Sequence, residues 1–511
     1  MRVELVCVGR DGGRRAVEVT AAPSHRVADL AAALGCRQEL YLGATPLPGW
    51  LSLTDAGIAD GAVLGLDRSA PPVMSSAVGG GVREIAVVGG LHGGPSATLY
   101  PSGALTIGRG TAADLVLRDS EVSRRHARVV TTGDGVSARL EDTGSRNGVR
   151  RNGELISGPV DLGPRDVVGL GETVVGLRPV VPADARVDDL PGTPVRVFHR
   201  PSRAPAAARA EDFPDPTRVA ALACAPSSRL WERRPSDVDF LRLRVGLRDE
   251  PAVAVEAVDL RQCGVFGIAG PRPSLTAVAR ALVAQAAVLH APDDLAVVVV
   301  TGHDAEADWD WVGWLPHTRP PTDDFDCARL VATDAGQARA RLGELYALVR
   351  ERVARRHGAL RAPGPDFLLV LDGVRRLREL PGLGELLSDG PPVGVHLLCL
   401  AQPGEVLPEG CAATLVATGP TGTRGRLTRP AAQAVHDVLL DGLAPDHATR
   451  LALALAPFRL EGEQPHEDWT GPIAVRERRF TALGRAQRAP VALDDDPDRT
   501  TAVSERGPGR R

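Results

Sequence analysis

Arginine, serine and asparagine side chains recur on short polar turns in the second hundred residues of the chain. The turns lie in Leu105–Arg109, Val122–His126 and Thr143–Gly148, each beside residues that alternate between apolar and polar. A guanidinium can hold a phosphate through paired charge-assisted hydrogen bonds, a hydroxyl can add another donor, and a side-chain amide can hold a peptide backbone. These groups predict a site for a phosphorylated peptide, provided that one fold brings the three turns together.

The elements that carry these turns predict a β-sandwich over residues 83–181. Short alternating strands separated by polar turns fill this stretch, and the turns at one end of a sandwich lie close together. The residue types and their spacing resemble a forkhead-associated (FHA) domain over the whole module. That resemblance implies that the ligand is a protein phosphorylated on threonine.

The same resemblance assigns roles to single residues. It implies that Arg109 and Ser123 hold the phosphate and that Asn147 contacts the ligand backbone. The full set of expected phosphopeptide contacts is Arg109, Ser123, Arg124, Ser145, Arg146 and Asn147. Architectural roles are expected for Gly108, His126 and Gly148. The alternative interpretation is that the loops keep the turn chemistry of the family while binding nothing.

A second candidate site lies where the strand predicted at 265–270 turns into a helix, since this is where an α/β fold would bind a nucleotide phosphate. Against the phosphate-loop pattern G-x-x-x-x-G-K-[ST], Gly267 and Ser274 fit. Arg272 replaces the second glycine, and Pro273 replaces the lysine. A proline supplies neither an amide donor nor an ammonium group.

This degenerate nucleotide site would comprise Gly267, Gly270, Ser274 and Asp372. Asp372 ends a predicted strand at the Walker B position, but a glycine follows it instead of a catalytic carboxylate. None of the 60 basic residues is a lysine. We therefore expect no ATPase activity and no cofactor, and ATP with Mg²⁺ would bind only if backbone amides around Gly270 sufficed.

Strands alternate with helices through residues 217–458, which predicts an α/β domain with a largely parallel sheet. The expected strands are Val265–Gly270, Leu295–Thr301, Phe367–Leu371 and Val395–Leu400, and the expected helices are Leu275–His290, Ala335–His357 and Pro445–Phe458. Three tryptophans within six residues, Trp309, Trp311 and Trp314, are expected to be buried.

Three segments of this region, Leu230–Pro235, Asp239–Gly246 and Asp308–His317, resemble FtsK/SpoIIIE-family ATPases of the EssC/EccC type, the motors of type VII secretion. The resemblance runs from about residue 195 to residue 457 and corresponds to the region before the first motor domain. Two transmembrane helices expected before Trp231 are missing, and the competent phosphate loops of the family would lie beyond this chain. The resemblance therefore implies a pseudo-ATPase relative.

The remaining segments complete a multidomain organisation. Residues 1–70 predict a hairpin, a short helix and further strands, an order that resembles a ubiquitin-like β-grasp module of some actinobacterial and firmicute secretion proteins. Residues 71–82 and 182–216 are expected to be linkers, and 459–511 a disordered tail. The predicted fold is thus a β-grasp module, an FHA β-sandwich and a degenerate P-loop-like α/β domain.

Composition excludes several classes of function. The net charge of −4 and only 17 aromatic residues give no strong signal for nucleic acid. Seven scattered cysteines without a CxxC spacing suggest neither a zinc site nor a disulfide framework, which favours a reducing cytoplasm. No apolar run is long enough to predict a membrane span.

The sequence therefore predicts a cytoplasmic phosphothreonine-binding adaptor or regulator without enzymatic activity. Its partners would be a phosphothreonine-containing protein and a full-length FtsK/SpoIIIE-type motor or another secretion component, which could hold it at the inner face of the membrane. One alternative is an ATP-binding FtsK/SpoIIIE-type translocase component for DNA or protein. A second alternative is a truncated relative without function.

Overall fold

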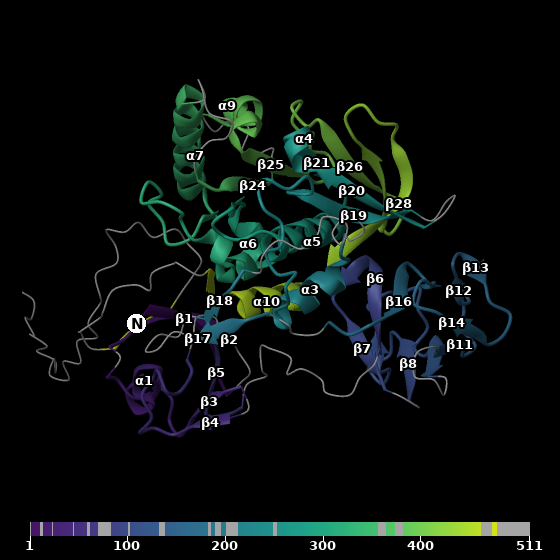
Figure 1. Cartoon of the computed structure of the whole chain (residues 1–511), viewed down its shortest axis with the longest axis horizontal. Coiled ribbons are helices and arrows are strands. Elements are labelled where there is room, and N and C mark those ends of the chain that lie inside the picture. Colours follow the sequence, from purple (N-terminus) through teal and green to yellow (C-terminus); the bar gives the residue numbers. More distant parts are fainter. Residues whose placement is uncertain are drawn as a thin grey trace, which may run out of the picture.

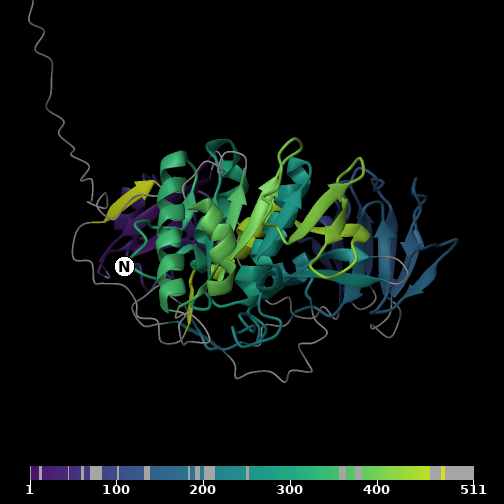
Figure 2. The ribbon, with the colours of Figure 1, turned by 90° about the horizontal axis from the view of Figure 1, so that it is seen from above.

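The computed structural model describes most of the chain. The described residues are 2–10, 14–22, 24–43, 45–58, 62–69, 83–100, 103–131, 138–181, 185–189, 196–200, 213–248, 253–355, 364–373, 382–460 and 473–477. Figures 1 and 2 show an N-terminal module and a β-sandwich toward opposite ends of the molecule, with an α/β domain between them. The predicted linker 71–82 lies outside the described residues.

The N-terminal module is a sheet of order β2-β1-β5-β3-β4 with one helix. Its elements are β1 (Arg2–Val8), β2 (Arg14–Thr20), α1 (Val27–Ala33), β3 (Leu40–Leu42), β4 (Thr45–Leu47) and β5 (Val63–Leu66). The first two strands are antiparallel, and β1 runs parallel to β5. Side chains on β1 alternate, so that Leu5 and Cys7 enter the core of the module while Val6 and Val8 pack against the α/β domain.

The structure corrects the prediction that everything after residue 458 is a disordered tail. β29 (Phe458–Leu460) pairs with β18 (Arg196–Phe198), and β30 (Ala474–Glu477) extends the N-terminal sheet along the outer edge of β2. Ile473 and Val475 pack against the core of that module. An edge strand offers unpaired backbone groups, and a four-residue segment is too short to reveal its period in the sequence.

The predicted linker 182–216 also contains ordered structure. β17 (Val187–Asp189) forms a hairpin with β18, and α3 (Pro216–Cys224) begins at its last residue. Phe198 is fully buried, with its ring centroid 5.3 Å from Trp231 and 6.4 Å from Phe458. Three-residue strands carry no readable periodicity, so the Pro-rich composition dominated the prediction.

Residues 83–181 form two facing sheets, as the alternation predicted. One has the order β14-β11-β10-β8-β9, and the other contains β13-β12-β15-β16-β6 with β7 on β6. The strands are β6 (Arg83–Gly93), β7 (Ser96–Leu99), β8 (Ala104–Gly108), β9 (Leu115–Val116), β10 (Ala127–Thr131), β11 (Ala138–Asp142), β12 (Arg150–Arg151), β13 (Glu154–Leu155), β14 (Val160–Leu162), β15 (Val167–Leu170) and β16 (Thr173–Arg178). Their inward side chains form one buried core.

The α/β domain has a parallel sheet of order β26-β21-β25-β24-β22-β23. Its strands are β21 (Val265–Ala269), β22 (Leu295–Val300), β23 (Val331–Ala332), β24 (Asp366–Asp372), β25 (Val395–Ala401) and β26 (Ala413–Thr418). Its helices are α4 (Leu260–Cys263), α5 (Arg272–Leu289), α6 (Glu306–Trp309), α7 (Ala335–Arg355), α9 (Leu383–Asp389) and α10 (Pro445–Leu455). Short 3-10 turns occur at His303–Ala305, Asp310–Trp314, Pro316–Thr318 and Pro391–Val393.

The sheet is buried on both faces. Val297 and Val299 of β22 point into a core shared with α3, α5 and α10, whereas Val298 and Val300 point into a core shared with α7 and α9. This explains why the parallel strands read as continuous apolar runs. Trp309, Trp311 and Trp314 are buried in the first of these cores, as expected. Within the described part of the chain, none of the helices combines the length and apolar character that a membrane crossing requires.

The sandwich and the α/β domain share one hydrogen-bonded sheet, which the sequence did not predict. β19 (Arg242–Arg248), β20 (Ala254–Asp259), β27 (Arg424–Thr428) and β28 (Val435–Leu443) extend the parallel sheet, and β28 pairs with β6 of the sandwich. The buried Arg244, which pairs with Asp441 of β28 at 2.5 Å, also donates across this junction to the carbonyl of Val88 in β6. Thr217 donates across it to the carbonyl of Val87 at 2.6 Å. The two modules are therefore joined by strand pairing and by side-chain hydrogen bonds.

Candidate functional site

The three predicted turns meet at one end of the sandwich. The amide of Arg109, after β8, donates to the carbonyl of Ser123 in the β9–β10 loop at 3.0 Å. The amide of Arg146, in the β11–β12 loop, donates to the hydroxyl oxygen of Ser123 at 3.1 Å. Ser123 therefore connects all three loops, and the structure brings together the residues that the sequence predicted for the phosphate site.

His126 fixes the relative position of two of these loops. Its ring is fully buried. The Ser123 amide donates to Nδ1 at 3.0 Å, so Nε2 carries the proton and donates to the Gly148 carbonyl at 3.1 Å. One neutral imidazole thus satisfies a donor on one loop and an acceptor on the next.

The two glycines with expected structural roles have steric reasons to be glycine. A Cβ on Gly108 would collide with the carbonyl group of Arg124. Gly148 has a φ of 74°, a conformation that side chains disfavour, and a Cβ there would collide with Leu155. Both residues allow the loops to approach each other closely.

The surface of the site is rich in guanidinium groups. Arg109, Arg124 and Arg146 are exposed around the partly buried Ser123. Three exposed guanidinium groups at the ends of three loops can donate to one anion from different sides. The arrangement is suited to a dianionic group presented on an extended peptide.

Two acidic residues that the sequence did not single out hold Asn147 and Ser145, which are predicted contact residues, in place. Asn147 donates to the carbonyl and to the carboxylate of Glu121, each at 2.9 Å. Asp142 accepts from the Ser145 amide at 2.8 Å and from its hydroxyl at 3.1 Å. The Asp142-Thr-Gly-Ser turn was readable as an Asx turn, whereas nothing in the sequence indicated Glu121.

At the second candidate site the structure leaves little room for a phosphate loop. β21 continues to Ala269 and α5 begins at Arg272, so only Gly270 and Pro271 lie between them. Gly267, predicted as the first loop glycine, instead lies inside β21 in register with Cys399 and Thr414 of the neighbouring strands. The motif spacing misplaced Gly267 because the strand extends two residues further than a phosphate loop allows.

Arg272 forms a partly buried ion-pair cluster in this crevice, which we call the Arg272 cluster, with Asp308 and Asp372. Its Nη1 and Nη2 atoms lie 2.6 and 2.8 Å from the two carboxylate oxygens of Asp372, and Nη2 lies 2.6 Å from Asp308. Thr301 and Trp309 also donate to Asp372, at 3.2 and 2.7 Å. The Asp372 side chain is 1% exposed, so its oxygens are occupied by protein donors.

The electrostatics favour a permanently charged guanidinium in the cluster. Burial acts to lower the pKa of Arg272, but the hydrogen bonds and charge of Asp372, followed by those of Asp308, outweigh it and raise the pKa above its usual value. A divalent cation would have to compete with this arginine for Asp372. The cluster therefore occupies the carboxylate that would bind Mg²⁺ in a nucleotide site.

The other predicted residues of this site face protein atoms. The Gly270 amide donates to the carbonyl of Ala401 at 3.1 Å, and a Cβ on Gly270 would lie 2.6 Å from that of Ala417. The Ser274 side chain is buried, and its hydroxyl oxygen has no hydrogen-bond partner among the described residues. This hydroxyl lies next to Gly422, and a Cβ on Gly422 would be only 2.5 Å from the hydroxyl oxygen.

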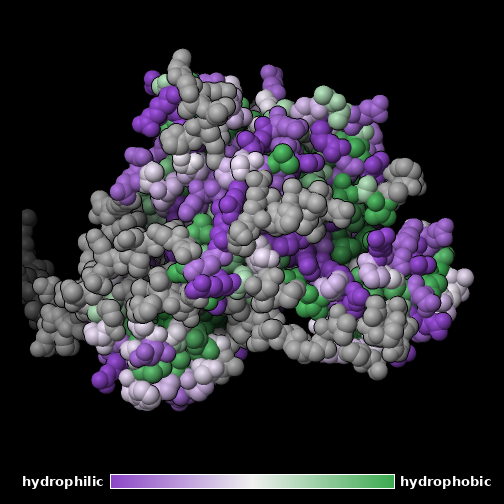
Figure 3. Space-filling model, viewed as in Figure 1, coloured by the Kyte–Doolittle hydropathy of each residue, from purple (hydrophilic) through white to green (hydrophobic). Residues whose placement is uncertain are grey.

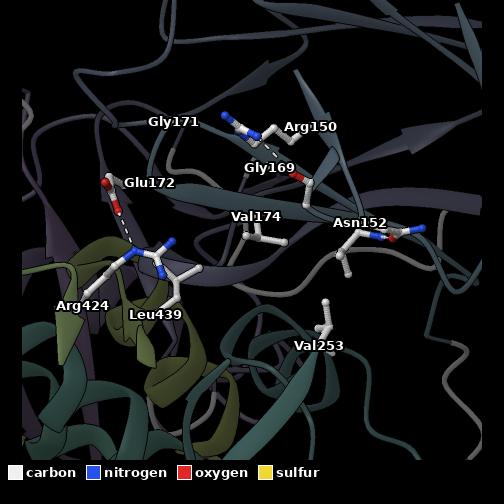
Figure 4. A pocket seen from close by; sticks show the side chains of 11 residues that line it. Arg150, Asn152, Gly169, Gly171, Glu172, Val174, Val253, Arg424 and Leu439 are labelled. Atoms are coloured by element: carbon white, nitrogen blue, oxygen red, sulfur yellow. Dashed lines mark hydrogen bonds and ion pairs between the residues drawn. The ribbon is translucent and has the colours of Figure 1, made fainter. Parts of the chain in front are cut away.

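A small cleft of about 100 Å³ lies at the seam between the sandwich and the α/β domain (Figure 4). Arg150 and Asn152 line it from the sandwich, and Val253 and Arg424 from the other domain. Glu172 crosses the seam, with a carboxylate oxygen 3.7 Å from Arg424. None of the residues predicted to bind the phosphopeptide lines this cleft, and on the face shown in Figure 3 the described apolar side chains are scattered among hydrophilic ones.

Parts of the chain are similar to a known domain family and to known secretion proteins. A family model of the FHA domain matches residues 105–171. The ESX secretion system protein EccC of Thermomonospora curvata is 28% identical over 301 residues, which cover 50% of this chain and 21% of that protein. The ESX-3 secretion system protein EccC3 of Mycobacterium tuberculosis is 32% identical over 171 residues, covering 26% of this chain and 13% of that protein.

Among solved structures, the FHA domain of the CT664 protein from Chlamydia trachomatis is 32% identical and covers 19% of this chain and 95% of its own, with a TM-score of 0.18. The cytoplasmic domain of the Thermomonospora curvata type VII secretion ATPase EccC is 20% identical and covers 48% of this chain and 34% of its own, with a TM-score of 0.34. The protein thus contains an FHA domain. It is a homologue, over part of its length, of the EccC ATPases of type VII secretion, and it spans about a fifth or less of the length of the EccC relatives named above.

Proposed function

We propose that the protein is a phosphothreonine-peptide-binding adaptor or regulator associated with an FtsK/SpoIIIE-type motor of a type VII secretion-like system, and that it has no ATPase activity of its own. The observation that carries the proposal is the convergence of three loops on Ser123 beneath three exposed guanidinium groups. The buried His126 preorganises these loops, so a phosphate would bind without ordering them first.

The lack of ATPase activity is supported by the Arg272 cluster. The guanidinium of Arg272 takes both oxygens of Asp372, and the only loop residues before α5 are Gly270 and Pro271. A competent phosphate loop supplies a series of free amides and a lysine ammonium group, and this chain contains no lysine. On this basis the α/β domain is a degenerate P-loop-like module that serves as a structural or docking part.

The proposed adaptor combines the phosphopeptide-binding site of the sandwich with the α/β domain. The sheet that runs from β6 through β28 holds the phosphopeptide site in a fixed orientation relative to the α/β domain. The likeness to EccC proteins favours a full-length motor or another secretion component as the second partner, at the inner face of the membrane in the cytoplasm. The antiparallel β1–β2 pair, the helix and the parallel β1–β5 pair support a β-grasp assignment for the N-terminal module, with a docking role.

Phosphorylation would control such an adaptor directly. A phosphate carries a charge of roughly −1.5 to −2 at neutral pH and three acceptor oxygens. Its removal by a phosphatase would eliminate the contacts with Arg109 and Ser123 and release the partner.

The proposal is tested by fluorescence titration of the full chain with a phosphothreonine peptide library and the matching unphosphorylated peptides. Selective binding is expected, and Arg109→Ala should abolish it. Arg128→Ala is the matched control, because Arg128 is exposed on β10 outside the three loops and its removal changes the net charge equally. Equal binding of both peptide forms, or equal loss of binding in both variants, would contradict the proposal.

A further inference from the structure

Two cysteine side chains meet beside the centre of the parallel sheet. Cys399 lies in β25 and is fully buried, whereas Cys411 lies near the end of the segment that connects β25 to β26 and is partly exposed. Both belong to the apolar cluster on the α7 and α9 side of the sheet. The two thiols are close enough for each to shift the pKa of the other.

Gly267 makes this meeting possible. It stands in register with Cys399 on the neighbouring strand, so both residues occupy the same level of the sheet. A Cβ on Gly267 would lie 3.0 Å from the sulfur of Cys411 and 2.7 Å from Leu407. The missing side chain thus leaves the space in which Cys411 packs above β21, next to Cys399. The packing of Cys411 therefore explains why residue 267 is a glycine, without any role in a phosphate loop.

We propose that Cys399 and Cys411 are a site of reversible oxidation, at which a hydroperoxide converts the two thiols into a disulfide. The sheet fixes one sulfur, the connecting segment carries the other, and the segment meets solvent on the side of Cys411. The inference is independent of phosphopeptide binding, because none of the three sandwich loops contributes to the pair.

The environment assigns different roles to the two cysteines. The hydrogen bond donated by Cys399 lowers the pKa of Cys411, although burial opposes this effect. As the donor in that bond and as a buried group, Cys399 has a pKa raised well above its usual value. Cys411 is partly exposed, whereas Cys399 is fully buried, so a hydroperoxide in solution reaches Cys411 first. The lowered pKa of Cys411 favours its thiolate, which is the nucleophile.

The chemistry proceeds in two steps. The Cys411 thiolate attacks one peroxide oxygen, the O–O bond breaks, and the products are a sulfenic acid and hydroxide, or an alkoxide from an organic peroxide. The sulfur of Cys399 then attacks the sulfenic sulfur. An S–S bond forms, and the sulfenic oxygen leaves as water with the thiol proton. The two electrons given up by the sulfurs have reduced the peroxide, and a dithiol reverses the reaction.

The expected consequence is a fixed connection between β25 and β26. The disulfide would close the loop from residue 399 to residue 411 and hold it against β21. This loop starts beside the carbonyl of Ala401, which accepts the amide of Gly270 at 3.1 Å. Oxidation would thus fix the boundary of the crevice that contains the Arg272 cluster and raise the thermal stability of the domain.

The other cysteines provide controls. Cys7, Cys224, Cys263 and Cys327 are buried. Cys36 is partly exposed, but its thiol donates to Asp67 at 3.1 Å, and burial together with this hydrogen bond raises the pKa of Cys36. It is therefore a matched, less reactive thiol at a similar level of exposure.

The test uses the full chain, hydrogen peroxide and peptide mass spectrometry without reduction. A linked peptide pair containing Cys399 and Cys411 is expected, with the loss of two titratable thiols and a rise in melting temperature that dithiothreitol reverses. Cys36→Ser should behave like the wild type, and Cys411→Ser should lose the disulfide. Cys399→Ala should stop at a sulfenic acid on Cys411 that dimedone traps.

Two results would overturn the proposal. One is the absence of the linked peptide after peroxide treatment of the folded chain. The other is the same rate of thiol loss in Cys411→Ser as in the wild type. Since Cys399 is buried and its replacement could affect folding, circular dichroism of Cys399→Ala is compared first, and the partly exposed Cys411→Ser variant carries the test if Cys399→Ala does not fold.

Discussion

Replacing Arg272 with alanine should destabilise the protein, because it leaves Asp372 buried without its counter-charge. The Asp372 side chain is 1% exposed, and among the described residues it keeps the donors Thr301 and Trp309. Removing one partner of a fully buried ion pair costs about 3–5 kcal/mol. Since Arg272 is 24% exposed and Asp308 is 37% exposed, solvent screens part of the interaction.

We therefore expect a loss of about 2–3 kcal/mol in the free energy of unfolding of the α/β domain for Arg272→Ala. In a domain of this size that corresponds to a fall of about 4–12 °C in Tm. The assay is urea denaturation and thermal melting of the full chain. Arg339→Ala is the control, because Arg339 is an exposed arginine on α7, and its removal should change stability by less than about 0.5 kcal/mol.

A double-mutant cycle with Asp372→Asn isolates the pair itself. We expect a coupling energy of at least about 1.5 kcal/mol, because the two side chains contact each other directly. Additive effects, or an Arg272→Ala variant as stable as the Arg339→Ala control, would refute this account of the crevice. So would an increase in the Tm of the wild type on adding ATP with Mg²⁺, because a nucleotide would then have displaced the arginine.

Other predictions concern the sandwich loops and the junction. His126→Ala should cost about 2–4 kcal/mol in urea denaturation, because two buried hydrogen bonds and the packing of the ring are lost, and it should also abolish phosphopeptide binding. Gly108→Ala should weaken that binding at least about tenfold by titration, since its methyl group meets the Arg124 carbonyl, whereas Gly158→Ala, with no atom near the added Cβ, should not. Burial raises the pKa of Asp441 from 3.8 to about 6, against the opposing charge of Arg244. The folded state therefore retains a proton that the unfolded state releases, so this contribution to stability is complete below about pH 4 and is lost as the pH rises through 6. The unfolding free energy of the wild type relative to Asp441→Asn should fall over that range, and a constant difference would contradict the shift.

The meeting of the three sandwich loops could be predicted because the residues concerned lie in short turns. The positions of Arg109, Ser123 and Asn147 follow from local spacing between strands, and the sandwich forces their loops to one end. His126 was predicted as architectural, and the structure supplies its two hydrogen bonds. The contact of Asn147 with Glu121 crosses between loops and leaves no local trace in the sequence.

The long strands and helices of the α/β domain were predictable for a similar reason. Buried runs such as β22 and long helices such as α5 and α7 extend over enough residues to show their pattern. β17, β18 and β30 have three or four residues each and gain their stability from a partner strand far away in the chain. Neighbouring composition therefore determined those predictions, and they were wrong.

The sequence also presented the modules as independent, and the structure joins them. The pairing of β28 with β6 and the hydrogen bond from Arg244 to the carbonyl of Val88 connect residues far apart in the chain. In the same way, the sequence shows that Arg272 replaces a phosphate-loop glycine. It does not show that Arg272 pairs with Asp372, which lies 100 positions later. Such pairings depend on the complete topology and not on local pattern.

Isothermal titration calorimetry tests the central claim most directly. The full chain is titrated with the tightest phosphothreonine peptide from the library and with its unphosphorylated twin, alongside Arg109→Ala and Arg128→Ala. Two or more charge-assisted hydrogen bonds to the phosphate predict that the phosphorylated peptide binds at least about 100-fold more tightly. This preference should disappear in Arg109→Ala and persist in Arg128→Ala. Equal affinities for the two peptides would show that the three loops do not read phosphothreonine.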